Sequence, residues 1–214
     1  MNRIIKSLTP FFTIFFAVRI LAQEPVTGPE EYFPLTVGWT WEYNTYANDT
    51  KEEFVMTVEI EKPETDNGTT YQILTQKDKR GRMRSFLEVN EEGIFVKKTG
   101  LKKSFTPEVF AVHEPAIPLF PFNLHNDLNI DWEGKLKVAW IKKDISLHIE
   151  FLGFEEITVP AGTFKCVKLY FDQTRDGERS EEYAWYARNI GQVKYIGGTY
   201  TKELTAFYKP TIKP

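Results

Sequence analysis

The sequence predicts an all-β protein built as a large, curved antiparallel meander sheet. From Trp39 onward, apolar and polar residues alternate with a period of two, which is typical of strands with one buried face. Short turn signals such as Asp66-Asn67-Gly68 separate the alternating runs, and short links favour antiparallel pairing of consecutive strands. After the first 22 residues, no stretch shows a convincing helical period over three turns.

Each expected strand rests on this alternation, as in the first, where Trp39, Trp41 and Tyr43 share one face. The predicted strands cover residues 39–44, 54–61, 70–76, 83–89, 93–98, 136–140, 145–151, 155–159, 164–173, 182–187, 192–197 and 199–208. Roughly eleven to twelve strands exceed what one flat sheet comfortably holds. We therefore expect a half-barrel or clam, a shape that resembles the lipoprotein-carrier folds of bacterial envelopes. A closed barrel or a two-sheet sandwich is the alternative.

Residues 106–129 form the longest segment without a strand pattern. They contain Pro107, Pro115, Pro118 and Pro121, interleaved with apolar side chains. Proline lacks the backbone donor that a central strand needs, and the apolar content disfavours a solvated loop. We expect this segment to fold over the concave face of the sheet as a lid or plug.

The first 22 residues have the pattern of an export signal. Arg3 and Lys6 precede an apolar run that ends at Leu21, and cleavage is expected after Ala22. Arg19 leaves an uninterrupted run of about a dozen residues, short of the ~20 of a spanning helix; an N-terminal anchor is the alternative. No cysteine near residue 22 could carry a thioether-linked lipid. The expected mature protein is periplasmic or extracellular, with no membrane span after cleavage.

The predicted organisation is therefore simple. Residues 1–22 are a signal peptide, 23–31 a flexible lead-in, 32–209 a single all-β domain and 210–214 a tail.

Charge and cysteine content narrow the function classes. The chain has 27 basic and 30 acidic side chains, and signal removal would take away three basic ones. This acidic, evenly mixed chain argues against a nucleic-acid partner, which would require a clustered basic face. Cys166 is the single cysteine, so no intramolecular disulfide can form. Stability must come from an aromatic-rich core.

No catalytic signature is present, and we expect neither an enzyme nor a cofactor. His113 and His125 lack the spacing of a metal-ligand pair, so no metal site is predicted. Cys166 lies in a predicted strand without an implied base, which favours a buried structural thiol over a nucleophile. His148 is expected on the polar face of its strand.

A resemblance to other exported proteins rests on three segments, residues 32–43, 157–169 and 182–194. Their PLxxGxxWxY, VPAGTFxCxK and WYAxxIGxVK patterns resemble a group of exported bacterial proteins of unknown function. The resemblance spans most of the mature chain and implies a shared fold, but no reaction and no catalytic residues.

The leading functional hypothesis is a non-catalytic exported protein that binds an apolar or amphipathic ligand, such as a lipid, in the concave face of the sheet. The side chains expected to line that site are Trp39, Trp41, Phe110, Leu119, Phe120, Phe122 and Trp185. A cell-envelope module that binds a protein partner, without a small-molecule ligand, is the alternative.

Overall fold

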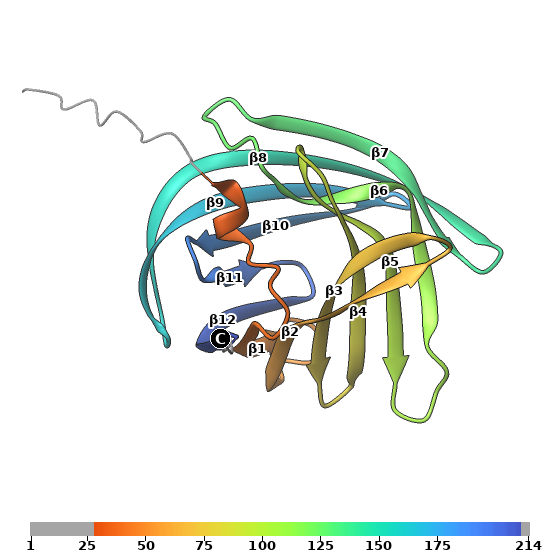
Figure 1. Cartoon of the computed structure of the whole chain (residues 1–214), viewed down its shortest axis with the longest axis horizontal. Helices are drawn as coiled ribbons and strands as arrows, with labels where there is room; N and C mark the ends of the chain where they lie inside the picture. Colours follow the sequence, from red (N-terminus) through yellow and green to blue (C-terminus); the bar gives the residue numbers. More distant parts are fainter. Residues whose placement is uncertain (1–27, 211–214) are drawn as a thin grey trace, which may run out of the picture.

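The computed structural model describes residues 28–210 and confirms an all-β fold (Figure 1). Twelve strands form an antiparallel meander, and β1 also pairs with β12, so the sheet closes into a barrel. The elements are η1 (a 3-10 helix, Pro29–Tyr32), β1 Thr40–Ala47, β2 Glu53–Asp66, β3 Thr69–Asp78, β4 Gly81–Val89, β5 Gly93–Lys103, β6 Val109–Pro121, β7 Asn129–Val138, β8 Ile141–Val159, β9 Gly162–Arg175, β10 Glu178–Ala187, β11 Gly191–Ile196 and β12 Tyr200–Tyr208. The predicted signal, residues 1–22, lies outside the described residues.

Most strands form where the alternation predicts them. The hairpin between β2 and β3 turns at Asn67 and Gly68, whose φ angles are 49° and 83°. Asparagine and glycine tolerate this left-handed region, which a two-residue hairpin requires. The two strands expected at 145–151 and 155–159 are one long strand, β8, with a bulge between Phe151 and Phe154 that lets it curve.

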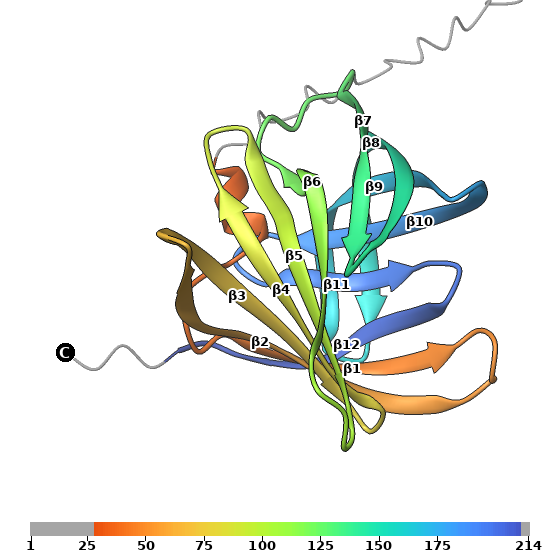
Figure 2. The ribbon, with the colours of Figure 1, turned by 90° about the vertical axis from the view of Figure 1, so that its right-hand side faces the viewer.

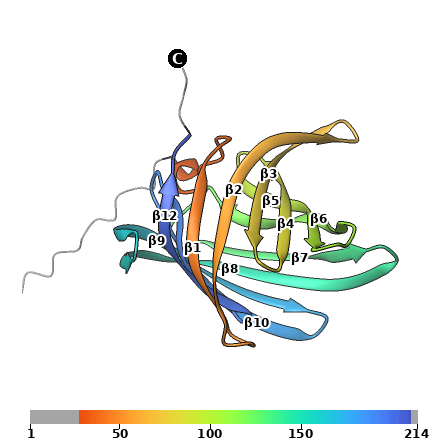
Figure 3. The same ribbon diagram turned by 90° about the horizontal axis from the view of Figure 1, so that it is seen from below.

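The barrel is one closed sheet, and strand pairing is shortest at two seams, β6–β7 and β11–β12. Across the seams of the described barrel, three residue pairs connect β6 with β7 and three connect β11 with β12. Figures 2 and 3 show the strands curving around a common interior. The structure is thus the closed barrel, the predicted alternative to a half-barrel or clam.

The proline-rich segment is not a lid or plug, and this prediction is wrong. Residues 109–121 form β6, a full strand of the barrel. The prolines are tolerated because β6 pairs with β7 only as far as Glu114, so the later residues face no ladder on that side. On the β5 side, Pro118 lies next to register shifts, where regular pairing is already interrupted.

The N-terminal segment packs onto the barrel instead. The backbone N–H of Asn189 donates to the carbonyl of Glu31 at 2.7 Å, which fixes η1 to the turn between β10 and β11. Phe33 is buried, with its ring centroid 5.9 Å from those of both Phe120 and Tyr186. In Figure 1, η1 lies near the ends of β9 to β11. The described part of the expected flexible lead-in, residues 28–31, is therefore structured.

Candidate functional site

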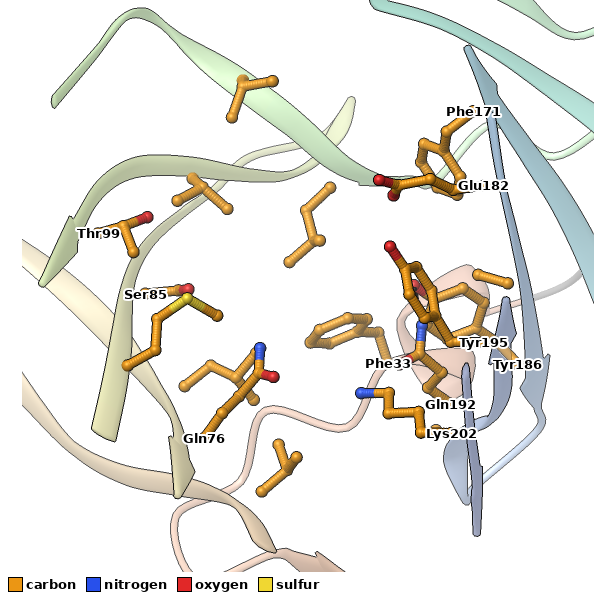
Figure 4. A pocket seen from close by; sticks show the side chains of 18 of the residues that line it. Phe33, Gln76, Ser85, Thr99, Phe171, Glu182, Tyr186, Gln192, Tyr195 and Lys202 are labelled. Atoms are coloured by element: carbon orange, nitrogen blue, oxygen red, sulfur yellow. Dashed lines mark hydrogen bonds between the residues drawn. The ribbon is translucent and has the colours of Figure 1, made fainter. Parts of the chain in front are cut away.

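The barrel interior contains a cavity of about 330 Å³ (Figure 4). Small-molecule sites usually measure about 300–1,000 Å³, so this volume suits a small ligand. One wall comes from β2 to β6, the facing wall comes mainly from β8 to β12, and Phe33 and Pro34 contribute from the N-terminal segment. The lining includes Val58, Leu74, Met83, Val96, Ile117, Glu182, Tyr186, Gln192, Tyr195 and Lys202.

The wall from β2 to β6 is mostly apolar. Val58, Leu74 and Val96 occupy inward positions of β2, β3 and β5, because alternate residues of a strand face one side of a sheet. Gln76 and Ser85 interrupt this surface with short polar groups. The wall can therefore hold an apolar body and offers few fixed hydrogen-bonding groups.

The facing wall carries a buried hydrogen-bond network. The Tyr43 hydroxyl donates to the backbone carbonyl of Gln192 at 2.7 Å, and the Gln192 side-chain amide donates to the Tyr186 hydroxyl at 3.1 Å. The Tyr195 hydroxyl bonds to the Glu182 carboxyl. Burial raises the pKa of Glu182 and of Tyr195, because a charged form loses its hydration inside the barrel. Most polar groups of this network therefore have a hydrogen-bond partner within it.

Lys202 is the exception on this wall. Its side chain is 5% exposed and projects into the cavity (Figure 4). Nζ lies 4.4 Å from the ring centroid of Tyr43 and 6.0 Å from that of Tyr195. Within residues 28–210 it makes no hydrogen bond or ion pair. Burial lowers the pKa of this lysine to about 7, because the ammonium ion loses its hydration.

His113 is a second buried polar group without a partner. It lines the cavity from β6 and is 7% exposed. Its Nδ1 atom has no hydrogen-bond partner among the described residues. Burial, with smaller contributions from the charges of Arg175 and Lys97, lowers its pKa to about 4, so the ring is neutral at pH 7.

The seven side chains predicted to line a binding site are dispersed. Trp41 and Leu119 line the cavity, and the Trp41 indole N–H donates to the carbonyl of Ile190 at 2.5 Å. Trp39 stacks on Trp41 with ring centroids 5.4 Å apart and does not reach the cavity.

Phe120 and Phe122 belong to the core around the cavity, where their rings contact each other. Phe110 and Trp185 require a correction, because both lie on the outer face of the barrel. Phe110 packs against Phe86, and the Trp185 indole N–H donates to Glu155 at 2.8 Å beneath Lys168. Aromatic size predicted burial, but burial occurs on both faces of this sheet.

Cys166 is fully buried, as expected for a structural thiol. Its S–H contacts the carbonyl of Phe164 at 3.4 Å, and burial raises the pKa of the thiol to about 12. His148 bonds to Asp131 and Glu150 on the outer face. Within residues 28–210, no group of three or more metal-ligating side chains comes together.

The strand pattern contains a signal for the polar cavity groups that sequence reasoning missed. Lys202 is two residues from both Tyr200 and Leu204 in its strand. Glu182 is likewise two and four residues from Ala184 and Tyr186. Each polar residue therefore shares the face of apolar neighbours and must point inward. A charged residue in phase with buried ones was the informative feature.

Comparisons with known proteins give one family model and two solved structures that resemble parts of this chain. Residues 129–203 match a family model described as DUF3108-like, a range that contains the second and third sequence patterns described above. A candidate lipoprotein from Parabacteroides distasonis is 17% identical with a TM-score of 0.49, covering 83% of this chain and 98% of that chain. A candidate exported protein with a YmcC-like fold from Bacteroides fragilis is 17% identical with a TM-score of 0.47, covering 81% of this chain and 97% of that chain. No curated protein matches the chain significantly. In the part of the chain that the structure describes, no helix is long and apolar enough to cross a membrane.

Proposed function

We propose that this protein is exported and binds a small amphipathic ligand inside its barrel. The observation that carries the proposal is the cavity of about 330 Å³. In it, apolar side chains face His113 Nδ1, a buried atom without a hydrogen-bond partner in the described chain, and the Lys202 amine, which makes no hydrogen bond or ion pair there. A compact protein core normally fills its interior and pairs its buried polar atoms. An unfilled interior with unsatisfied polar atoms is the arrangement expected of a ligand site.

The barrel also weakens the alternative of a protein-binding module. A partner strand can add to a sheet only where backbone donors and acceptors are free. Here β1 pairs with β12, so closure removes the outer edges of the meander. A small ligand can bind in the interior cavity of the closed barrel, whereas addition of a partner strand would be confined to the short seams.

A neutral fluorescent probe tests this proposal. N-phenyl-1-naphthylamine should bind saturably to the wild-type protein and gain fluorescence. Val58→Phe should weaken binding by about tenfold or more, because the larger ring occupies the cavity. Val55→Phe is the matched control, since Val55 lies on the outward face of the same strand and is 58% exposed.

The control variant should bind the probe as the wild type does. Absence of saturable binding to the wild type, or unchanged binding to Val58→Phe in a folded protein, would refute the proposal. Circular dichroism of each variant establishes that the barrel has formed.

A further inference from the structure

The unpaired Lys202 indicates what kind of ligand the cavity accepts. A buried ammonium group normally has an anionic partner or hydrogen-bond acceptors, because burial without them is strongly unfavourable. Glu182 is the carboxylate among the residues that line the cavity, yet it bonds to Tyr195 and forms no ion pair with Lys202. Figure 4 shows the Glu182 carboxyl beside the Tyr195 hydroxyl, away from the Lys202 amine. The protein itself thus supplies no counter-charge to this amine.

We propose that the ligand is an amphipathic oxyanion, with a carboxylate or phosphate group bound by Nζ of Lys202 and an apolar chain packed against the wall from β2 to β6. This inference rests on the proposed function and specifies its ligand class. An ammonium–oxyanion hydrogen bond is stronger than a neutral one and gains further in a site shielded from water.

Gln76 supports this assignment from the opposite wall. Its side-chain amide points into the cavity toward Lys202 (Figure 4) and makes no hydrogen bond within residues 28–210. An amide N–H and an ammonium group can both donate to one oxyanion. The two walls therefore offer donors to the same type of group.

The surface next to the cavity is lined by more basic than acidic side chains. A second hollow shares Gln76, Met83 and Tyr200 with the cavity. Its other lining residues include Lys77, Arg80, Arg82 and Lys103, against the single acidic residue Asp78. Arg82 pairs with Glu108 at 3.9 Å, Lys77 pairs with Glu59 and Glu61, and Arg80 pairs with Asp78. Lys103 forms no ion pair in the described chain. Lys103 is therefore the unpaired cation of this hollow, and its charge favours the approach of an anionic ligand.

Matched amphiphiles test the inference. Binding of dodecanoate, dodecyl phosphate, dodecanol and dodecyltrimethylammonium is measured by displacement of N-phenyl-1-naphthylamine. The wild type should bind the two anionic amphiphiles about tenfold or more tightly than dodecanol, and the cationic one least tightly. Lys202→Met should abolish this preference while retaining dodecanol binding. Lys142→Met, at an exposed lysine of β8, should preserve the preference.

Acetate and inorganic phosphate separate a lipid-like ligand from a free anion. Both should displace the probe far less effectively than the corresponding amphiphiles. Displacement by inorganic phosphate at the concentration effective for dodecyl phosphate would overturn the amphipathic part of the inference.

A pH series provides a test that does not depend on the Lys202 variant. The other charged and titratable groups that line the cavity are Tyr43, His113, Arg175, Glu182, Tyr186, Tyr195 and Tyr200. Among them, Glu182 could also repel an anion when ionised. The Glu182→Gln variant removes that contribution and keeps an acceptor for Tyr195. In it, dodecanoate affinity should still fall as pH rises from about 7 to about 9, by up to tenfold per pH unit, whereas dodecanol affinity should not change.

The outcomes distinguish the two proposals. Equal binding of dodecanoate and dodecanol to the wild type overturns the oxyanion inference and leaves ligand binding intact. An anion preference that persists in folded Lys202→Met also overturns it. A wild type that binds neither the probe nor any amphiphile refutes the proposed function itself.

Discussion

Replacing Lys202 by methionine should change how the stability of the ligand-free protein depends on pH. The folded protein holds this lysine with a pKa of about 7, against an ordinary value of 10.5 in the unfolded chain. Between these two values the unfolded chain carries a proton that the folded protein lacks. The free energy of unfolding therefore rises with pH across this window, by up to about 1.4 kcal/mol per unit.

The size of the effect follows from the same two values. Below pH 7, Lys202 is protonated in both the folded protein and the unfolded chain. The folded protein then carries the whole free-energy penalty of the buried charge. The difference in pKa corresponds to an upper value of about 5 kcal/mol. Methionine has a similar length and no charge, so Lys202→Met should stabilise the protein most at low pH and least near pH 10.

Urea unfolding monitored by tryptophan fluorescence measures the pH dependence of the free energy of unfolding. Free energies of unfolding are compared at several values from about pH 6 to about pH 9 for the wild type, Lys202→Met and Lys142→Met. The wild type and the exposed-lysine control should show parallel slopes, and Lys202→Met should show a flatter one. Parallel profiles for all three proteins would refute the reasoning, because Lys202 would then be solvated or paired in solution.

Four further outcomes are expected. The free energy of unfolding should fall by up to about 3 kcal/mol as pH drops from 6.5 to 4, where the unfolded chain protonates His113 and the folded protein does not; His113→Gln should lose this dependence in urea titrations. Phe120→Ala should destabilise by about 3–5 kcal/mol in the same assay, whereas Phe110→Ala, on the outer face of the same strand, should lose much less. The Cys166 thiol should react with a bulky maleimide no faster than the protein unfolds, and rapid labelling of native protein would contradict its burial. Protein exported by a Gram-negative host should begin at Gln23 by N-terminal sequencing, and a membrane-bound chain that retains residues 11–21 would exclude cleavage.

Strand positions were predictable from sequence because alternation reports directly which residues share a face. Trp41 and Tyr43 point inward together, and the Asn67-Gly68 turn fixes the neighbouring hairpin. The sequence supports a closed barrel only as an alternative to an open one, since alternation does not say whether the first and last strands meet. That outcome depends on accumulated twist and curvature, to which bulges such as the one beside Gly153 contribute.

The predictions of a lid and of an aromatic binding site fail for equally specific reasons. Proline predicted an interruption at residues 106–129, but a strand whose second half lacks one neighbour can accommodate proline there. The predicted site relied on large aromatic side chains, and Phe110 shows why this fails: the outer face has its own apolar cluster with Tyr71, Ile73 and Phe86. Size alone does not distinguish a cavity wall from a core or a covered outer face.

The location of the unsatisfied polar groups is the strongest argument that this interior is more than a core. Lys202 and His113 come from strands on opposite sides of the cavity. In the described chain, His113 Nδ1 is a buried atom without a hydrogen-bond partner, and the Lys202 amine makes no hydrogen bond or ion pair. Natural domains are stable by only about 5–15 kcal/mol, so two such groups remove a large fraction of that margin. A lysine at this position does not stabilise the empty barrel, and an apolar residue would do better. Its presence is explained if an oxyanion completes the site, because the same burial that weakens the empty protein then strengthens the bound pair.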